Sequence, residues 1–149
     1  EKFRYNDKRY NLIISNQPYG RNTVNDIFNS DLSHLIIHHW FVAKSARMLR
    51  DKGIIAMILP QFFLDNTKEH ARDIINASGV NLILAYRLPD NLFLDAKITV
   101  DLVFLQKTDK TDEWQATRQK KIGEHSKPIN EYFFNNPHHV LGELAIAVT

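Results

Sequence analysis

Two histidines in this sequence have a spacing that could bind a metal ion. His34 and His38 are four residues apart, so one face of a helix would carry both, as in the zinc proteases. That motif also needs a glutamate directly after the first histidine, and position 35 is leucine. We therefore expect no metal site here, and we expect His34, His38 and the adjacent His39 to lie on a helix surface or to be partly buried.

Carboxylates and basic side chains offer two further kinds of chemistry. Asp90, Asp95 and Asp101 could form a cluster for metal-assisted cleavage of nucleic acid, but aspartates in loops and at strand edges are commonly structural. Lysines and arginines between positions 107 and 121 could bind phosphate, but acidic residues alternate with them, which is typical of a solvated arm. Neither pattern predicts an activity.

A turn that combines polar and aromatic side chains follows the first apolar segment of the chain. The segment from Tyr10 to Ser15 is short, apolar and β-branched, which predicts a buried strand. The turn formers Asn16, Pro18 and Gly20 end it. Taken alone, Asn-Gln-Pro-Tyr-Gly also fits an ordinary type I or type II turn.

Placed after a strand, Ser15-Asn16-Gln17-Pro18-Tyr19-Gly20 resembles the Asn-Pro-Pro-Tyr loop of the amino-methylating, adenine-specific DNA methyltransferases. Such enzymes act on an adenine that is flipped out of the duplex, because a stacked base is out of reach. The resemblance implies that the Asn16 side-chain carbonyl and the Gln17 backbone carbonyl accept the two amine protons, which helps to localise the nitrogen lone pair. It also implies that Pro18 stiffens the loop and that Tyr19 stacks on the base.

Two later segments resemble the same family in the same order. Residues 53–64 resemble its next strand and turn, and residues 88–105 resemble its later base-contacting loop and strand. Phe93 falls where the family places an aromatic residue against the flipped base, and we expect Phe93 and Lys97 to contact the substrate. Relatives often carry glycine near Lys97, and its absence here changes how closely the backbone can approach nucleic acid. The main departure is Gln17, which stands where the first proline is expected and removes one restraint on the loop.

The methyl donor of this family, S-adenosylmethionine, is bound by a glycine-containing turn and an acidic residue that follow earlier strands. The chain has five glycines, none of them in a Gly-x-Gly arrangement, and only residues 1–9 precede the catalytic strand. The resemblance therefore implies the catalytic-loop half of the domain, a fragment that is inactive alone. It is similar to those in large restriction-modification or helicase-fused methyltransferases.

Apolar and amphipathic segments alternate along the chain. Apolar positions every three or four residues predict a long helix from Asp31 that Gly53 closes, and a shorter one over residues 67–77. Apolar runs over residues 54–59, 80–86 and 99–106 predict further strands. This order predicts an α/β fold, a partial Rossmann-like methyltransferase fold with a mostly parallel sheet, flanking helices and ligands at the carboxyl ends of its strands.

Length and composition place limits on the chain. Its 149 residues, 44% hydrophobic and 24% charged, fit a globular domain. We expect residues 1–107 to be the C-terminal half of the catalytic domain, residues 108–127 a charged linker or arm, and residues 128–149 a tail that starts a following region. The lack of cysteine excludes disulfides and cysteine-ligated zinc. No apolar run reaches the roughly 18 residues of a membrane span, so we expect a cytoplasmic protein with no membrane partner.

The leading hypothesis is methyl transfer from S-adenosylmethionine to the exocyclic amine of adenine, with DNA carrying a flipped adenine as the partner. One alternative is a non-catalytic nucleic-acid-binding module whose loop still accepts a base by stacking. Another is a structural interaction module in which an exposed sheet edge pairs with another chain, for example as an edge-strand dimer of the fragment.

Overall fold

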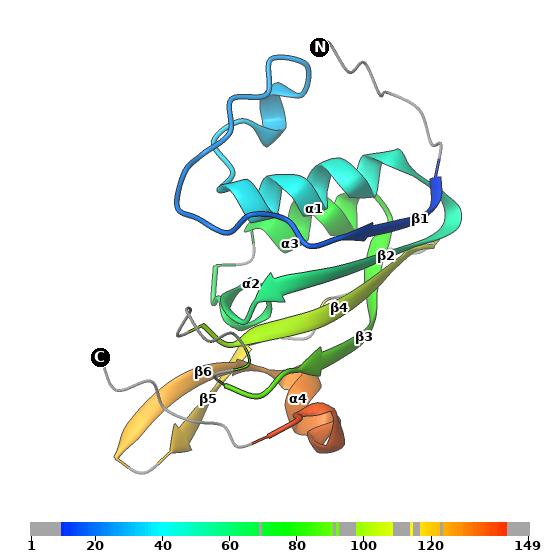
Figure 1. Cartoon of the computed structure of the whole chain (residues 1–149). Coiled ribbons are helices and arrows are strands. Elements are labelled where there is room, and N and C mark those ends of the chain that lie inside the picture. Colours follow the sequence, from blue (N-terminus) through cyan, green and yellow to red (C-terminus); the bar gives the residue numbers. More distant parts are fainter. Residues whose placement is uncertain are drawn as a thin grey trace.

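The computed structural model of the chain describes residues 10–68, 70–90, 92, 98–108, 114, 117–122 and 124–142. Strands, helices and two short 3₁₀ turns alternate through it (Figure 1). In chain order they are β1 (Tyr10–Ser15), η1 (Ser30–Leu32), α1 (Ile37–Met48), β2 (Leu49–Pro60), α2 (Phe62–Asp65), α3 (His70–Ala77), β3 (Val80–Arg87), β4 (Val100–Lys107), β5 (Thr117–Ile122), β6 (His125–Asn130), α4 (Glu131–Asn135) and η2 (Pro137–His139).

The main sheet has four strands in the order β1-β2-β4-β3. β1 pairs with β2 in parallel, whereas β4 is antiparallel to both β2 and β3. β1, β2 and β3 therefore run in one direction, and β4 runs against them from its place between β2 and β3. The α/β, partial Rossmann-like fold is confirmed, but two of the three strand pairings in this sheet are antiparallel. The apolar run of β4 did not reveal this, because a strand that is largely buried on both faces lacks polar alternation whether it runs parallel or antiparallel to its neighbours.

One face of the sheet carries the core. Residues directly opposite each other on paired strands project to the same face, and on this face the side chains of β2 and β4 are buried together with one side of α1. The members that show the pattern are Ile55, Met57 and Leu59 on β2, Val103 and Leu105 on β4, and Val42, Ala43 and Ala46 on α1. This face fixes the position of α1 over β1 and β2 (Figure 1).

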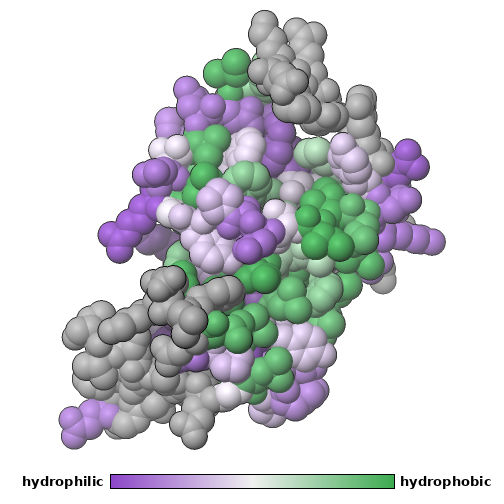
Figure 2. All heavy atoms as spheres, viewed as in Figure 1, coloured by the Kyte–Doolittle hydropathy of each residue, from purple (hydrophilic) through white to green (hydrophobic). Residues whose placement is uncertain are grey.

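The opposite face is apolar but incompletely covered at β1. Leu12 and Ile14 lie opposite Ile54 and Ala56, on the second face, and are 55% and 74% exposed. Figure 2 shows apolar side chains gathered over this part of the sheet. β1 was expected to be buried, and the structure corrects this, since the described residues cover its inner face alone.

The long helix begins later than its periodicity predicts. His34 has a φ of 74°, a left-handed conformation that no continuous helix contains. The backbone around it pairs instead with an earlier segment, because Val24 N–H donates to the Leu35 carbonyl and His34 N–H donates to the Val24 carbonyl. α1 therefore starts at Ile37, and His34 and His38 do not share a helix face.

Gly53 lies inside β2 and does not cap α1, which ends at Met48. A Cβ atom at this position would lie 2.8 Å from the Arg50 carbonyl oxygen and 3.0 Å from that of Tyr10, so the close approach of two backbones requires glycine.

With 12 residues α1 is short of the roughly 20 that cross a bilayer. In the described residues we find no helix long and apolar enough for a membrane span.

Part of the segment expected to be an exposed arm is folded. β5 and β6 form an antiparallel hairpin, which with α4 lies beside β3, at the end of the sheet away from β1 (Figure 1). Ile129, Tyr132 and Phe133 are buried, and the Tyr132 hydroxyl accepts a hydrogen bond from the Ala85 N–H on β3. The start of the tail therefore packs on the domain; the division into 1–107, 108–127 and 128–149 stays a prediction.

Candidate functional site

The loop after β1 is tied to β2 by two side chains. The Gln17 Nε2 group donates to the Ile58 carbonyl oxygen at 2.7 Å, and the Tyr19 hydroxyl donates to the same oxygen at 2.9 Å. Gln17 is buried, whereas Asn16 and Pro18 on either side of it are exposed. Within the described part of the chain, no hydrogen bond engages the Asn16 side chain. The loop thus presents an amide group to solvent from a backbone that β2 holds.

The Tyr19 ring packs near the buried ring of His38. His38 on α1 meets Tyr19 edge to face at a centroid distance of 6.3 Å and Phe62 on α2 at 5.2 Å. His38 is fully buried, and neither of its ring nitrogens has a hydrogen-bond partner among the described residues. Burial lowers the pKa of His38 to about 4 and raises that of Tyr19, so at neutral pH the imidazole is uncharged and the phenol keeps its proton.

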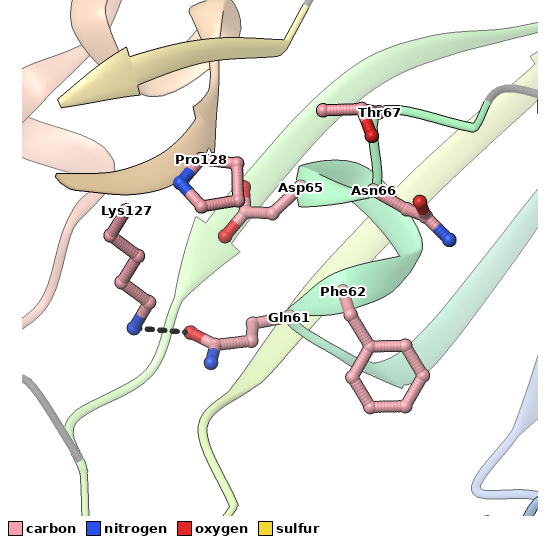
Figure 3. Close-up of a pocket in the computed structure, with 7 residues that line it drawn as sticks. All are labelled: Gln61, Phe62, Asp65, Asn66, Thr67, Lys127 and Pro128. Atoms are coloured by element: carbon pink, nitrogen blue, oxygen red, sulfur yellow. Dashed lines mark hydrogen bonds between the residues drawn. The ribbon is translucent and has the colours of Figure 1, made fainter. Parts of the chain in front are cut away.

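A small cavity lies on the other side of Phe62, at the carboxyl end of β2. It has a volume of about 280 Å³ and is lined by residues of α2 and β6. Figure 3 shows Gln61 and Lys127 pointing toward each other at its rim, where the Lys127 ammonium donates to Gln61 Oε1 at 3.2 Å. Its lining is Gln61, Phe62, Asp65, Asn66, Thr67, Lys127 and Pro128. Phe62 belongs to this lining, and its ring, which Figure 3 shows pointing away from Lys127 and Pro128, packs against His38.

A buried ion network holds α2 in place beside this cavity. Arg87 donates from Nε and Nη2 to the two carboxylate oxygens of Asp101, each at 2.8 Å, and its Nη1 lies 2.9 Å from Asp65 Oδ2. Although burial opposes it, these carboxylates raise the pKa of Arg87 above its ordinary value. Asp65 Oδ1 accepts the Asn130 N–H at 2.8 Å, and the Phe133 ring lies 4.3 Å from the Arg87 guanidinium carbon. The network therefore joins the carboxyl end of β3 and α2 to β6 and α4.

The structure places the predicted site residues unequally. Asn16, Gln17, Pro18 and Tyr19 lie together at the carboxyl end of β1. Phe93 and Lys97 lie outside the described residues, as does Asp95, so their predicted roles stay predictions. Asp101 is paired with Arg87, and Asp90 accepts a hydrogen bond from the Thr99 hydroxyl. Among the described residues no three histidine or acidic side chains are grouped to hold a metal ion.

Comparison with known families decides what this loop belongs to. The family model described as Eco57I restriction-modification methylase matches residues 1–93, which is more than half of the chain. The chain belongs to the Eco57I restriction-modification methylase family. The match includes the loop after β1, α1, β2 and β3. No curated protein sequence matches the chain.

Solved structures share the fold of this Eco57I-family chain. It is 20% identical to a protein described as the modification subunit of a type I restriction enzyme from Vibrio vulnificus YJ016, with a TM-score of 0.60 over 89% of this chain and 31% of that one. The EcoKI M protein, described as a type I restriction enzyme, is 16% identical, with a TM-score of 0.55 over 90% of this chain and 30% of that one. A protein described as a class I S-adenosylmethionine-dependent methyltransferase from Listeria monocytogenes is 17% identical, with a TM-score of 0.54 over 72% of this chain and 34% of that one. The chain spans about a third of each of these proteins.

The described residues of the Eco57I-family chain do not fit a complete S-adenosylmethionine site. Of the four described glycines, only Gly20 follows the carboxyl end of a strand, and it belongs to the candidate loop itself. The buried carboxylates near that edge, Asp65 and Asp101, are both committed to Arg87. Neither the glycine turn nor a free acidic side chain at a strand end is found in the described ranges, so we derive no step through the donor.

Sequence reasoning missed two parts of this site. The Ile58 carbonyl oxygen is a backbone atom, and no residue type announces that two side chains will reach it. The burial of His38 beside Tyr19 depends on where α1 starts, which the helical periodicity placed wrongly. Phe62 lies in the segment that resembles the family, so this resemblance was the one signal that could have pointed to it.

Proposed function

We propose that the full-length protein carrying this chain transfers a methyl group from S-adenosylmethionine to the exocyclic amine of adenine in DNA. The observation that carries the proposal is the loop after β1, where an exposed Asn16 stands beside a ring that is fixed to β2. Family membership and the fold shared with methyltransferases support it, as does the position of the loop at the carboxyl end of β1, where open α/β sheets bind their ligands.

The loop residues divide the work of holding the base. The Asn16 side-chain carbonyl and the Gln17 backbone carbonyl accept one amine proton each, which concentrates the lone pair on the nitrogen that is to be methylated. The Tyr19 ring stacks on the flipped base, and Pro18 limits the backbone between these groups. We further propose that Phe93 and Lys97, which precede β4 in the sequence, contact the substrate.

The neutral surroundings of Tyr19 suit this task. A flipped adenine is uncharged and planar, so it binds best to apolar surfaces with a few placed acceptors. His38 remains uncharged at neutral pH because burial holds its pKa at about 4, and therefore the imidazole behind the stacking ring carries no positive charge. The proton acceptors of the loop are then the nearest polar groups that the amine meets.

The exposed face of β1 supports a second part of the proposal, that this chain alone is inactive. Leu12 and Ile14 leave apolar area uncovered on a strand that pairs on one side only within the described sheet. We propose that the rest of the full-length protein adds a further strand beside β1 and supplies the donor site. An edge-strand dimer of the isolated fragment would use the same surface.

The test is methyl transfer to adenine-containing duplex DNA by the full-length protein and, in parallel, by this chain alone. The proposal expects labelled methyl groups on adenine with the full-length protein and none with the chain. Transfer to cytosine, RNA or protein would contradict the substrate assignment. A folded full-length protein that binds donor and DNA without transfer would instead indicate a binding module.

A further inference from the structure

We infer that the Gln17 side chain is a positioning residue, which fixes the loop of residues 16–19 on β2 and so replaces the restraint of a proline at this position. The inference deepens the proposed function and rests on it. It concerns the side chain alone, whereas the base contact proposed above uses the Gln17 backbone carbonyl.

The reach of Gln17 explains how a polar side chain can stiffen the loop. The parallel pairing of β1 with β2 ends at Ser15 opposite Met57, and Ile58 is the next residue of β2. Two residues past the end of β1, Gln17 turns inward to 4% exposure and donates to the Ile58 carbonyl oxygen at 2.7 Å. A side-chain bond therefore continues the attachment of the chain to β2 after the backbone pairing has ended.

The same carbonyl oxygen couples Gln17 to Tyr19. Its second hydrogen bond, from the Tyr19 hydroxyl at 2.9 Å, anchors the loop two residues further on. Pro18 lies between the two anchors, and its ring fixes its own φ. The stretch from residue 17 to residue 19 is thus held at both ends and stiff in the middle, which limits movement of the proposed acceptors.

The hydrogen bond to the Ile58 carbonyl requires a side chain at position 17 that is as long as glutamine and ends in a donor. Methionine would fill a similar volume without a donor, and glutamate at neutral pH would place an acceptor against an acceptor. Gln17 Oε1 is buried and has no hydrogen-bond partner among the described residues, which costs stability that an apolar side chain would not lose. Its bond to the Ile58 carbonyl is therefore the interaction by which the amide of Gln17 holds the loop.

The experiment compares Gln17→Met and Gln17→Pro in the full-length protein. Gln17→Met leaves the Ile58 carbonyl with its bond from Tyr19, so no acceptor is orphaned and the fold should persist. Gln17→Pro restores a fixed φ without the side-chain bond. Each variant is measured in single-turnover methyl transfer and in native-state cleavage by trypsin after the exposed Arg21, a readout of loop opening that needs no activity.

We expect Gln17→Met to lower the single-turnover rate roughly two- to tenfold, the worth of one hydrogen bond, with less than about a twofold change in DNA affinity. Cleavage after Arg21 should accelerate by about the same factor. Gln17→Pro should bring both the transfer rate and the cleavage rate most of the way back to the wild-type values. The matched control is Gln106→Met, because Gln106 Nε2 on β4 also donates to a backbone carbonyl, that of Lys52 near the start of β2, far along the strands from the loop. It should change neither readout.

Wild-type rate and wild-type cleavage in Gln17→Met would overturn the inference. Equal losses in Gln17→Met and Gln17→Pro would also overturn it, because restoring φ would then not replace the side chain. If the wild-type protein transfers no methyl group, the proposed function fails while the cleavage rates of the three variants still decide the role of Gln17.

Discussion

Tyr19 reaches from the loop after β1 to β2 and donates its hydroxyl to the Ile58 carbonyl oxygen at 2.9 Å. Burial raises the pKa of Tyr19, so the hydroxyl stays protonated and remains a donor. The position of the ring therefore depends on the neighbouring strand as well as on its own loop. In the proposed site this separates two roles, since the hydroxyl anchors and the ring stacks.

Sharing of one acceptor predicts that the two anchors are not independent. Tyr19→Phe and Gln17→Met each leave one hydrogen bond on the Ile58 carbonyl. Tyr19→Phe should lower the free energy of unfolding by about 0.5–1.5 kcal/mol, and Gln17→Met should lower it by less, because it also removes the buried, unpaired Oε1. The double variant orphans that carbonyl and should lose about 1 kcal/mol more than the sum of the single losses. Urea unfolding of the four proteins measures the cycle. Additivity within about 0.5 kcal/mol would show that the shared acceptor is unimportant.

Buried His38 predicts a loss of stability in mild acid. Its folded pKa of about 4 lies below the ordinary value of 6.5, so between these pH values the unfolded chain binds a proton that the folded chain does not. Stability is therefore retained above pH 6.5 and falls toward pH 4. Since neither ring nitrogen has a partner among the described residues, His38→Leu should fold normally and reduce this slope by up to about 1.4 kcal/mol per pH unit.

The measurement is the free energy of unfolding at several pH values from 4 to 7, with the exposed His138 replaced by leucine as control. His39 contributes in the same direction, because burial, followed by the charges of His38 and Arg72, lowers its pKa to about 3. The variant should therefore keep part of the slope. An unchanged slope in His38→Leu would mean that His38 is not buried as a neutral ring.

How far the sequence predicted the fold depends on the range of the interactions. β1 matched its predicted limits, β2 and β3 contain their predicted runs, and β4 is shifted by one residue from its predicted run, because short apolar segments between turn residues carry a local signal. The start of α1 was wrong because the pairing of Val24 with residues 34 and 35 overrides helical periodicity with contacts that no local pattern encodes. The reversed direction of β4 likewise follows from the partners that it lies between.

The candidate site was predictable to a similar degree. The Asn-Gln-Pro-Tyr sequence and the apolar strand before it pointed to Asn16, Gln17, Pro18 and Tyr19. These residues are grouped because they are adjacent in the chain. What the sequence left undetermined is the surroundings, since Ile58, His38 and Phe62 come from three other elements. The departure at Gln17 looked like lost rigidity, and the contact that compensates for it spans 41 positions of the sequence.

The buried network around Arg87 predicts a large cost for breaking one pair. Asp101 is fully buried and binds Arg87 through both carboxylate oxygens, so Asp101→Asn leaves the guanidinium undercompensated and should destabilise the protein by about 3–5 kcal/mol. The exposed pair of Arg118 with Glu131 is the control, because Arg118→Ala should cost less than about 1 kcal/mol. Denaturant unfolding compares both variants with the wild type. Similar small losses for the two would show that the Arg87 pair is open to solvent.

The uncovered face of β1 predicts a difference between the chain alone and the full-length protein. Ile14 is 74% exposed here, so Ile14→Lys should change the stability of the isolated chain by less than about 0.5 kcal/mol. If other parts of the full-length protein cover β1, the same change buries a charge there and should reduce both stability and methyl transfer strongly. Ile83→Lys on β3, 46% exposed at the other edge, is the control. Equal effects of Ile14→Lys in both proteins would contradict a covered β1.

The most direct measurement of the central claim is methyl transfer to adenine-containing DNA by the full-length protein with the native loop, with Asn16→Ala and with Tyr19→Ala. The proposed function predicts transfer to adenine with the native loop. Asn16→Ala should abolish it because one amine acceptor is lost, and Tyr19→Ala because the stacking ring is lost. Undiminished transfer in both variants, or none by a folded native protein that binds the donor, would contradict the assignment of this loop as the catalytic site.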